Sequence, residues 1–179
     1  MAVRGRLVLW ATLHRSHRRL RRTARGLAGR HRVIVVPLLE REHTRHALDL
    51  ACRLAADRGA RVLLLAPLFV EWELPLDAHF QREENKLRLE LGRQRALAES
   101  YGVGAKGLIV RARHGQLGRA VADAAEIAYA SLVVVGAANE TRRGYRHAFS
   151  RDVWSVLNDA PCPVMVATAS QRVGTSTAA

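Results

Sequence analysis

A strand, a loop, a helix and a second strand follow one another at residues 131–168, and this unit constrains the fold more than any other part of the sequence. The run LVVVG at residues 132–136 is apolar and branched enough for a strand buried on both faces, and VMVAT at residues 164–168 has the same character. Between them, Ser150 is placed to cap a helix. Apolar residues at i, i+4, i+7 and i+8 give that helix one buried side: Phe149, Val153, Val156 and Leu157.

The same alternation of strands and helices is predicted from residue 32 onward. Apolar runs predict three more strands, at residues 32–39, 60–69 and 105–112. Helical spacing predicts three more helices, at about residues 43–58, 80–101 and 115–129. The last of these has an apolar inner face made of Leu117, Val121, Ala124, Ala125 and Ala128. Alternating elements of this length imply an α/β fold, with a five-stranded parallel sheet that is doubly wound and Rossmann-like.

One predicted helix carries a conflicting pattern. In the charged segment at residues 80–101, Leu87, Leu89 and Leu91 alternate as they would in a strand. Glu84 and Arg88 nevertheless have the i, i+4 spacing that supports a helix. We therefore predict a helix there.

Ligands of doubly wound sheets bind beyond the carboxyl ends of the strands, where the strand order reverses. The strand ends at Leu39, Phe69 and Gly136 are expected to meet at this crevice. The loop after Gly136 is rich in arginine and leads to a helix N-terminus, which itself attracts anions. These residues predict an anion site, and a merely solvated charge run is the alternative. Asp152 opposes the anion site, because a carboxylate in the first turn already satisfies the helix dipole and repels phosphate.

These residues resemble those of the universal stress protein family, over roughly residues 31–168. Nucleotide-binding members carry G-x2-G-x9-G-[ST] after the fourth strand and enter the fifth through an APCPV-like segment, which matches APCPV at residues 160–164 here. The resemblance implies an adenine nucleotide alpha-hydrolase-like fold with strand order 3-2-1-4-5. It also implies ATP or AMP as the ligand and a homodimer formed through the last strand.

The glycine pattern of that family is incomplete in this chain. Gly136 fills the first position, but Asn139 and Phe149 stand where the second and third glycines would be. A loop that wraps phosphates needs positive φ angles and close backbone approach, which Phe does not provide. Leu39 occupies the place of the family's adenosine-side Asp. We therefore expect a degenerate site with weak or no ATP binding.

The final Ser or Thr position of the motif falls on Ser150, or on Arg151 when counted back from residues 160–163. The loop arginines then take the place of the missing glycine amides. The predicted cofactor-binding residues are Leu39, Gly136, Asn139, Arg142, Arg143, Ser150 and Arg151.

The sequence offers little for catalysis or metal binding. Ser150 has no His and acid arrangement nearby, so we expect no enzyme activity. The pairs His14/His17 and His43/His46 supply two ligands each, which is too few for a zinc site. Cys52 and Cys162 lack metal-ligand spacing, and we expect them to be structural and the compartment to be the reducing cytoplasm.

Positive charge is concentrated in residues 1–30, which hold nine arginines and no acid. The rest of the chain contributes 20 − 16 = +4 of the net charge of +13. Leu7, Trp10, Leu13 and Leu20 lie near helical spacing, as in an amphipathic helix that binds an anionic membrane surface or a membrane protein. Nucleic acid is less favoured, since Trp10 alone could stack on bases. A disordered tail is the alternative, and we expect residues 169–179 to be one too.

Three functions remain open from the sequence. We favour a universal-stress-like regulatory or stress-response binding module with a degenerate nucleotide site, and an ATP- or AMP-binding universal stress protein is the second. The third is a cytoplasmic regulatory domain derived from an amino-acid permease. In some bacterial permeases such a domain follows the last membrane helix after a basic linker, and residues 7–30 look similar to that junction. No apolar run reaches the length of a bilayer span, so attachment to the inner face of the membrane would be peripheral.

Overall fold

The computed structural model describes residues 32–39, 41–138 and 149–168. The elements follow in the order β1 (Val33–Pro37), α2 (Arg41–Arg58), β2 (Arg61–Phe69), α3 (Gln81–Ser100), β3 (Ala105–Ala112), α4 (Leu117–Ala128), β4 (Ala130–Ala137), α5 (Arg151–Asp159) and β5 (Val164–Thr168). The five strands form one parallel sheet with the order β3-β2-β1-β4-β5. The predicted fold class and strand order are confirmed.

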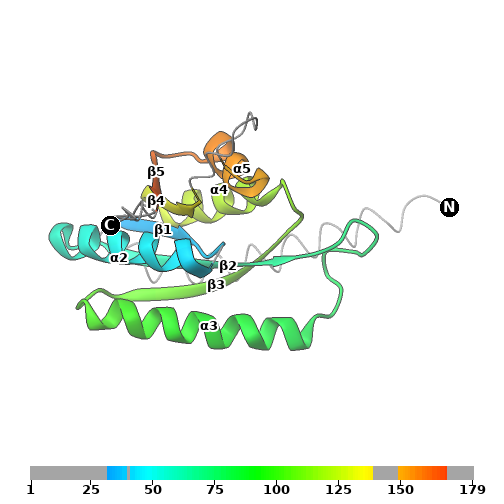
Figure 1. Ribbon diagram of the computed structural model, residues 1–179, viewed down its shortest axis with the longest axis horizontal. Coiled ribbons are helices and arrows are strands. Elements are labelled where there is room, and N and C mark those ends of the chain that lie inside the picture. The colour runs from blue at the N-terminus through cyan, green and yellow to red at the C-terminus, as the bar shows by residue number, and fades with distance from the viewer. Residues whose placement is uncertain (1–31, 40, 139–148, 169–179) are drawn as a thin grey trace, which may run out of the picture.

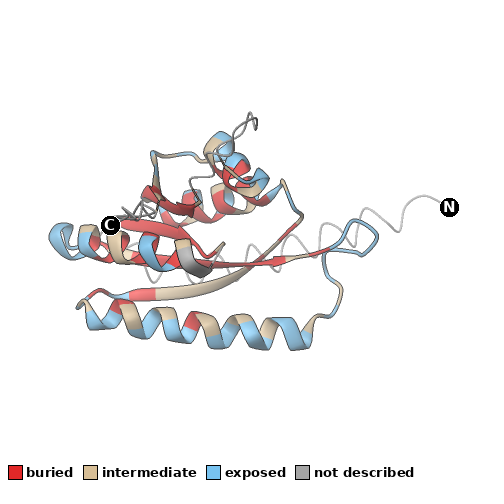
Figure 2. Ribbon diagram, in the orientation of Figure 1, coloured by how far each residue is buried: buried red, intermediate tan, exposed pale blue. Residues whose placement is uncertain are grey.

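The sheet is buried on both faces because its central strands are built from branched apolar residues. Ile34 and Val36 of β1 and Val62, Leu64 and Ala66 of β2 pack under α2 and α3. Val33, Val35, Leu63 and Leu65 pack under α4 and α5. Figure 1 shows α3 on one side of the strands and the pair α4 and α5 on the other. Figure 2 shows the buried residues concentrated in the strands and on the inward sides of the helices. Among the helices of the described ranges, none has both the length and the apolar character of a membrane span.

Helix α4 shows how the apolar pattern becomes packing. Its five predicted inner residues are all at most 1% exposed. The helix is shorter than predicted, because Gly115 has a φ of +79° and Tyr129, the residue after the helix, adopts the left-handed conformation. Left-handed residues end helices, since the backbone there cannot continue the hydrogen-bonded turn.

Helix α3 is continuous through the alternating leucines. Leu91 is 7% exposed and lies against Gly107 of β3, whereas Leu89 is 68% exposed. Leu91 and Ala98, seven residues apart, are the two buried positions of the helix. Helical spacing puts Leu89 and Leu91 on different sides of α3, so only the one that faces β3 is buried, and the alternation has no structural counterpart.

Helices α4 and α5 meet at a glycine. A β-carbon built on Gly118 would lie 2.0 Å from the carbonyl oxygen of Ser155, which is backbone and cannot rotate away. The Gly118 N–H donates to Ser155 Oγ at 2.9 Å, and that hydroxyl donates to the Asp152 carbonyl at 2.9 Å. This contact holds the middle of α5 in place beside the start of α4.

We predict that Gly118→Ala lowers the free energy of unfolding by about 3 kcal/mol, at the upper end of overpacking costs, because two helix backbones must separate. Gly92→Ala is the matched control, since its β-carbon would meet nothing within 4 Å in the middle of α3. That change should raise stability by roughly 0.5–1 kcal/mol. Denaturant unfolding measures both, and equal effects of the two substitutions would contradict this account of the helix contact.

Candidate functional site

The strand order reverses between β1 and β4, so the crevice expected for a ligand lies beyond their carboxyl ends. Leu39 lies two residues past β1 and is partly buried. Its side chain packs on the apolar cluster beneath α4 and also on a small cluster of Val135, Ala137 and Val153. The β1 side of the crevice is therefore apolar.

Gly136 lies in β4 at the same edge and makes an unusually close contact with α2. A β-carbon at this position would lie 2.3 Å from the carbonyl oxygen of His43 and 3.0 Å from the amide nitrogen of Thr44. The absence of a side chain lets the first turns of α2 cross over β4. Packing alone thus requires a glycine here, whether or not a ligand binds.

The start of α5 contributes the other described residues of the predicted site. The Ser150 hydroxyl caps the helix by accepting from the Val153 amide, at a long 3.4 Å. The aliphatic part of Arg151 lies on Gly115, since a β-carbon there would be 2.7 Å from Arg151 Cδ. Asn139, Arg142 and Arg143 lie outside the described residues, so their roles stay predictions.

Asp152 is the centre of a contact between α5 and the loop after β3. Its Oδ1 accepts from the Gly115 N–H at 2.6 Å, and its Oδ2 lies 3.0 Å from His114 Nδ1. The His114 ring in turn stacks on Phe69, with ring centroids 4.0 Å apart and an interplanar angle of 12°. The end of β2, the loop after β3 and the first turn of α5 are joined in this way.

Sequence reasoning placed Phe69 at this edge and Asp152 in the first turn of α5, but it missed their link through His114. The one available signal was that Phe69, the last residue of β2, and His114, two residues past β3, lie at the same ends of neighbouring parallel strands. Nothing in the sequence indicated that Asp152 would bond the backbone of another loop.

Catalytic chemistry has few candidates in the described part of the chain. Burial raises the pKa of the Cys52 thiol to about 11, and burial also raises the pKa of Cys162. Both thiols are therefore poor nucleophiles at neutral pH. In the ranges that the structure describes, no three His, Cys, Asp or Glu side chains are grouped to hold a metal ion.

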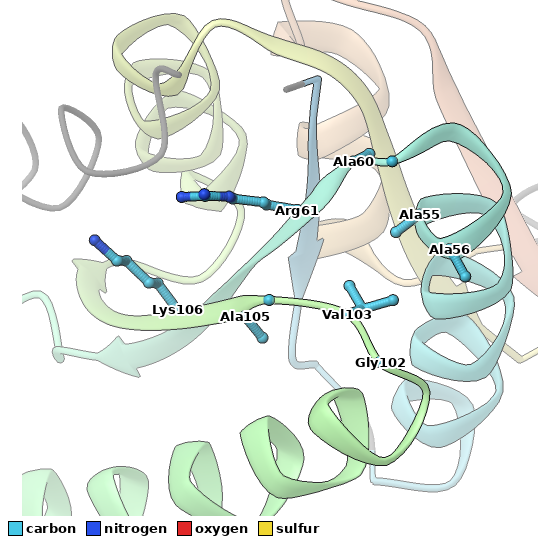
Figure 3. A pocket seen from close by; sticks show the side chains of 10 residues that line it. Ala55, Ala56, Ala60, Arg61, Gly102, Val103, Ala105 and Lys106 are labelled. Carbon is cyan, nitrogen blue, oxygen red and sulfur yellow. The ribbon is translucent and has the colours of Figure 1, made fainter. Parts of the chain in front are cut away.

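A cavity of about 400 Å³ lies at the opposite, amino-terminal edge of the sheet, lined by the end of α2 and the starts of β2 and β3. Figure 3 shows Arg61 and Lys106 extending to one side of the strands, while Ala55, Ala56 and Val103 lie on the other. The two cations do not converge over the small apolar residues. We therefore place the candidate site at the carboxyl edge, where this topology binds ligands.

The universal stress protein family matches residues 30–168, and the chain belongs to that family. A universal stress protein from Archaeoglobus fulgidus superposes with a TM-score of 0.61 at 16% identity, over 76% of this chain and 93% of that chain. A family member from Burkholderia pseudomallei gives 0.55 at 25% identity, over 75% and 93%. The Archaeoglobus fulgidus protein in complex with dAMP gives 0.57 at 13% identity, over 76% and 96%. No protein of curated function matches the sequence significantly.

We predict that Asp152→Ala exposes the Gly115 amide to exchange. A hydrogen bond to a charged group contributes about 1.5–3 kcal/mol, so exchange of this amide should quicken roughly 10-fold to 100-fold. His114→Ala is the control, because it removes the exposed partner of Asp152 and leaves the Gly115 bond intact. Native-state hydrogen exchange followed by NMR reads out both, and unchanged protection in Asp152→Ala would show that the carboxylate does not hold this loop.

Proposed function

We propose that this chain is a universal-stress-like regulatory module that binds without catalysis and has a degenerate nucleotide site, with weak or no affinity for ATP and AMP. The observation that carries the proposal is the position of Asp152. Its carboxylate is 16% exposed and is fixed by the Gly115 amide in the first turn of α5. This is the turn that a phosphate would approach.

Electrostatics argue against a phosphate at that place. Like unit charges about 4 Å apart near a protein surface repel by roughly 4 kcal/mol. The favourable field of a helix N-terminus contributes only about 0.3–1 kcal/mol at exposed sites. One fixed carboxylate therefore outweighs the attraction of the α5 N-terminus for an anion.

The apolar side of the crevice supports the same conclusion. An acid at the end of the first strand can accept hydrogen bonds from sugar hydroxyls, as the family's Asp is expected to do. Leu39 has no such atom, and its side chain packs into two apolar clusters. A nucleotide would lose its partner for the sugar as well as the favourable field for its phosphate.

Nucleotide binding of the ordinary kind is the second candidate. Two structural relatives favour it, a universal stress protein in complex with dAMP and another in complex with cAMP. In this chain such binding would depend on the arginines predicted after Gly136 to replace glycine amides.

Calorimetric titration of the purified chain with ATP, AMP and inorganic phosphate separates the two candidates. We expect dissociation constants above roughly 1 mM, which correspond to a binding free energy of about 4 kcal/mol or less. The constants should be similar for all three ligands, and salt should weaken the binding further. Asp152→Asn keeps an acceptor for the Gly115 amide but removes the charge, and should strengthen phosphate binding about tenfold. Asp123→Asn, an exposed acid of α4, is the matched control and should change nothing.

Tight and nucleotide-selective binding by the unmodified chain would contradict the degenerate site. It would mean that Gly136, Ser150 and the arginines rebuild a phosphate site. The double variant Arg142→Ala, Arg143→Ala should then lose that binding.

We also propose that the chain dimerises through β5. Among the strands that the structure describes, β5 is at the edge of the sheet and pairs with β4 alone. An unpaired edge is prone to join another chain. Val164 and Val166 face the cluster beside α5, whereas Met165 is 37% exposed. A charged side chain at Met165 can therefore test whether the β5 edge forms the dimer, because it does not enter the core.

We expect Met165→Lys to weaken the dimer at least tenfold, about 1.4 kcal/mol, because a lysine must be desolvated between the two edges. Leu89→Lys places the same charge on the exposed side of α3 and should leave the mass unchanged. Light scattering over a dilution series measures the mass. A strict monomer for the unmodified chain at tens of micromolar would rule out this dimer.

A further inference from the structure

The connection between β2 and α3 presents large apolar side chains to solvent. Figure 1 shows it projecting past the end of the strands, and Figure 2 shows it exposed along most of its length. Trp72 is 64% exposed, Leu74 42% and Leu76 39%. Exposed acids alternate with them, namely Glu71, Glu73 and Asp77, and residues 70–80 contain no Lys or Arg. We call residues 71–77 the acidic loop.

Two arginines from the end of β3 hold the acidic loop in place. Arg113 donates to the carbonyl oxygens of Glu71 at 2.8 Å and Leu74 at 3.1 Å, and its guanidinium lies 4.6 Å from the centre of the Trp72 ring. Arg111 donates to the carbonyl oxygens of Leu76 and Ala78, at 2.6 and 2.8 Å.

Arg111 is itself fixed by the Glu84 carboxylate at the start of α3, at 2.6 Å. Bonds to a charged donor are stronger than neutral ones, so the loop backbone is set by several of them at once. The loop backbone therefore cannot rearrange to bury these side chains without breaking those bonds. Several large exposed apolar side chains that lie close together on a fixed backbone are typical of a docking site.

We propose that the acidic loop is the docking site for residues 1–30 of the same chain. The two segments are complementary in charge, with three acids and no base in one against nine arginines and no acid in the other. They are also complementary in apolar character, because Leu7 and Trp10 supply large side chains to meet Trp72 and Leu74. An anionic membrane or a nucleic acid would instead be repelled by the acids of the loop.

The length of the N-terminal segment matches the path that this docking requires. The described part of the chain begins at Arg32. The Arg32 carbonyl accepts a hydrogen bond from the Arg61 amide, so Arg32 lies at the amino end of β2. The acidic loop follows the carboxyl end of the same strand. The nine residues of β2 span about 30 Å. Residues 11–31 would span about 32 Å even as a helix, and more if extended. Trp10 can therefore reach the loop of its own chain.

The test uses the full chain, labelled with ¹⁵N, with a nitroxide spin label on Ser16→Cys and with Cys162→Ser. Cys52 is buried and its pKa is raised, so it stays unlabelled. The NMR signal of the Trp72 indole N–H is assigned by its absence from the spectrum of Trp72→Phe. We expect the nitroxide to broaden this signal until it is lost, and the signal to return when the nitroxide is reduced. An unchanged Trp72 signal would overturn the proposal.

Charge reversal on the loop supplies the specific control. The triple variant Glu71→Lys, Glu73→Lys, Asp77→Lys should keep its Trp72 signal, because the arginines are then repelled, while the backbone bonds from Arg111 and Arg113 remain available. A second triple variant reverses three exposed acids elsewhere, with Asp57→Lys, Asp123→Lys and Glu126→Lys. This variant should lose its Trp72 signal just as the parent chain does. Signal loss that persists in the loop variant would overturn the proposal.

A mixture of two chains separates docking within one molecule from docking between molecules. Spin-labelled chain without ¹⁵N is mixed with ¹⁵N-labelled chain without nitroxide. The Trp72 signal should be retained in this mixture. Its loss there would overturn the assignment to the same chain.

Discussion

Burial of the parallel sheet on both faces is the constraint on which the rest of the structure depends. The central strands consist mainly of buried apolar residues that face both sides of the sheet, so the sheet needs helices on both of its faces. With the strand order β3-β2-β1-β4-β5, this requirement puts α2 and α3 on one face and α4 and α5 on the other. The carboxyl ends of β1 and β4 are then left at the point where the order reverses. The place where this topology binds ligands is thus a consequence of how the core is covered.

Two glycines adjust the helices against this sheet and thereby shape the crevice. Gly136 admits the backbone of α2 over β4, and Gly118 admits the backbone of α5 beside α4. The second contact brings Asp152 within reach of the Gly115 amide, which puts a fixed carboxylate at the place where a phosphate would lie. Gly118 and Gly136 thus serve helix packing, and the described residues at this edge of the sheet are apolar beside β1 and acidic at the start of α5.

The arginines of this chain fall into groups with different partners, observed for one group and predicted for the others. Arg111 and Arg113 are held by backbone carbonyls of the β2–α3 connection, so their charge fixes a loop. Those near the start of α5 belong to the predicted anion site, and those of residues 1–30 have the acidic loop as their proposed partner. A count of positive charge alone would treat these groups as equivalent. The surroundings of Arg111 set it apart, because a guanidinium paired with carbonyls and a carboxylate is no longer available to a ligand.

The sequence by itself determined the element order, the parallel sheet and the inner faces of the helices, because these follow from apolar periodicity, which is local. It also indicated the family through the residues around Gly136 and the last strand. The tertiary structure alone decided that Leu91, and not Leu89, is buried, that Asp152 bonds Gly115, and that Arg113 lies over Trp72. The Asp152–Gly115 bond and the Arg113–Trp72 contact join residues that lie close together only because of how helices and strands pack. The burial of Leu91 depends on which side of α3 meets β3. No pattern along the chain records such distances, since they are set only when the sheet is covered.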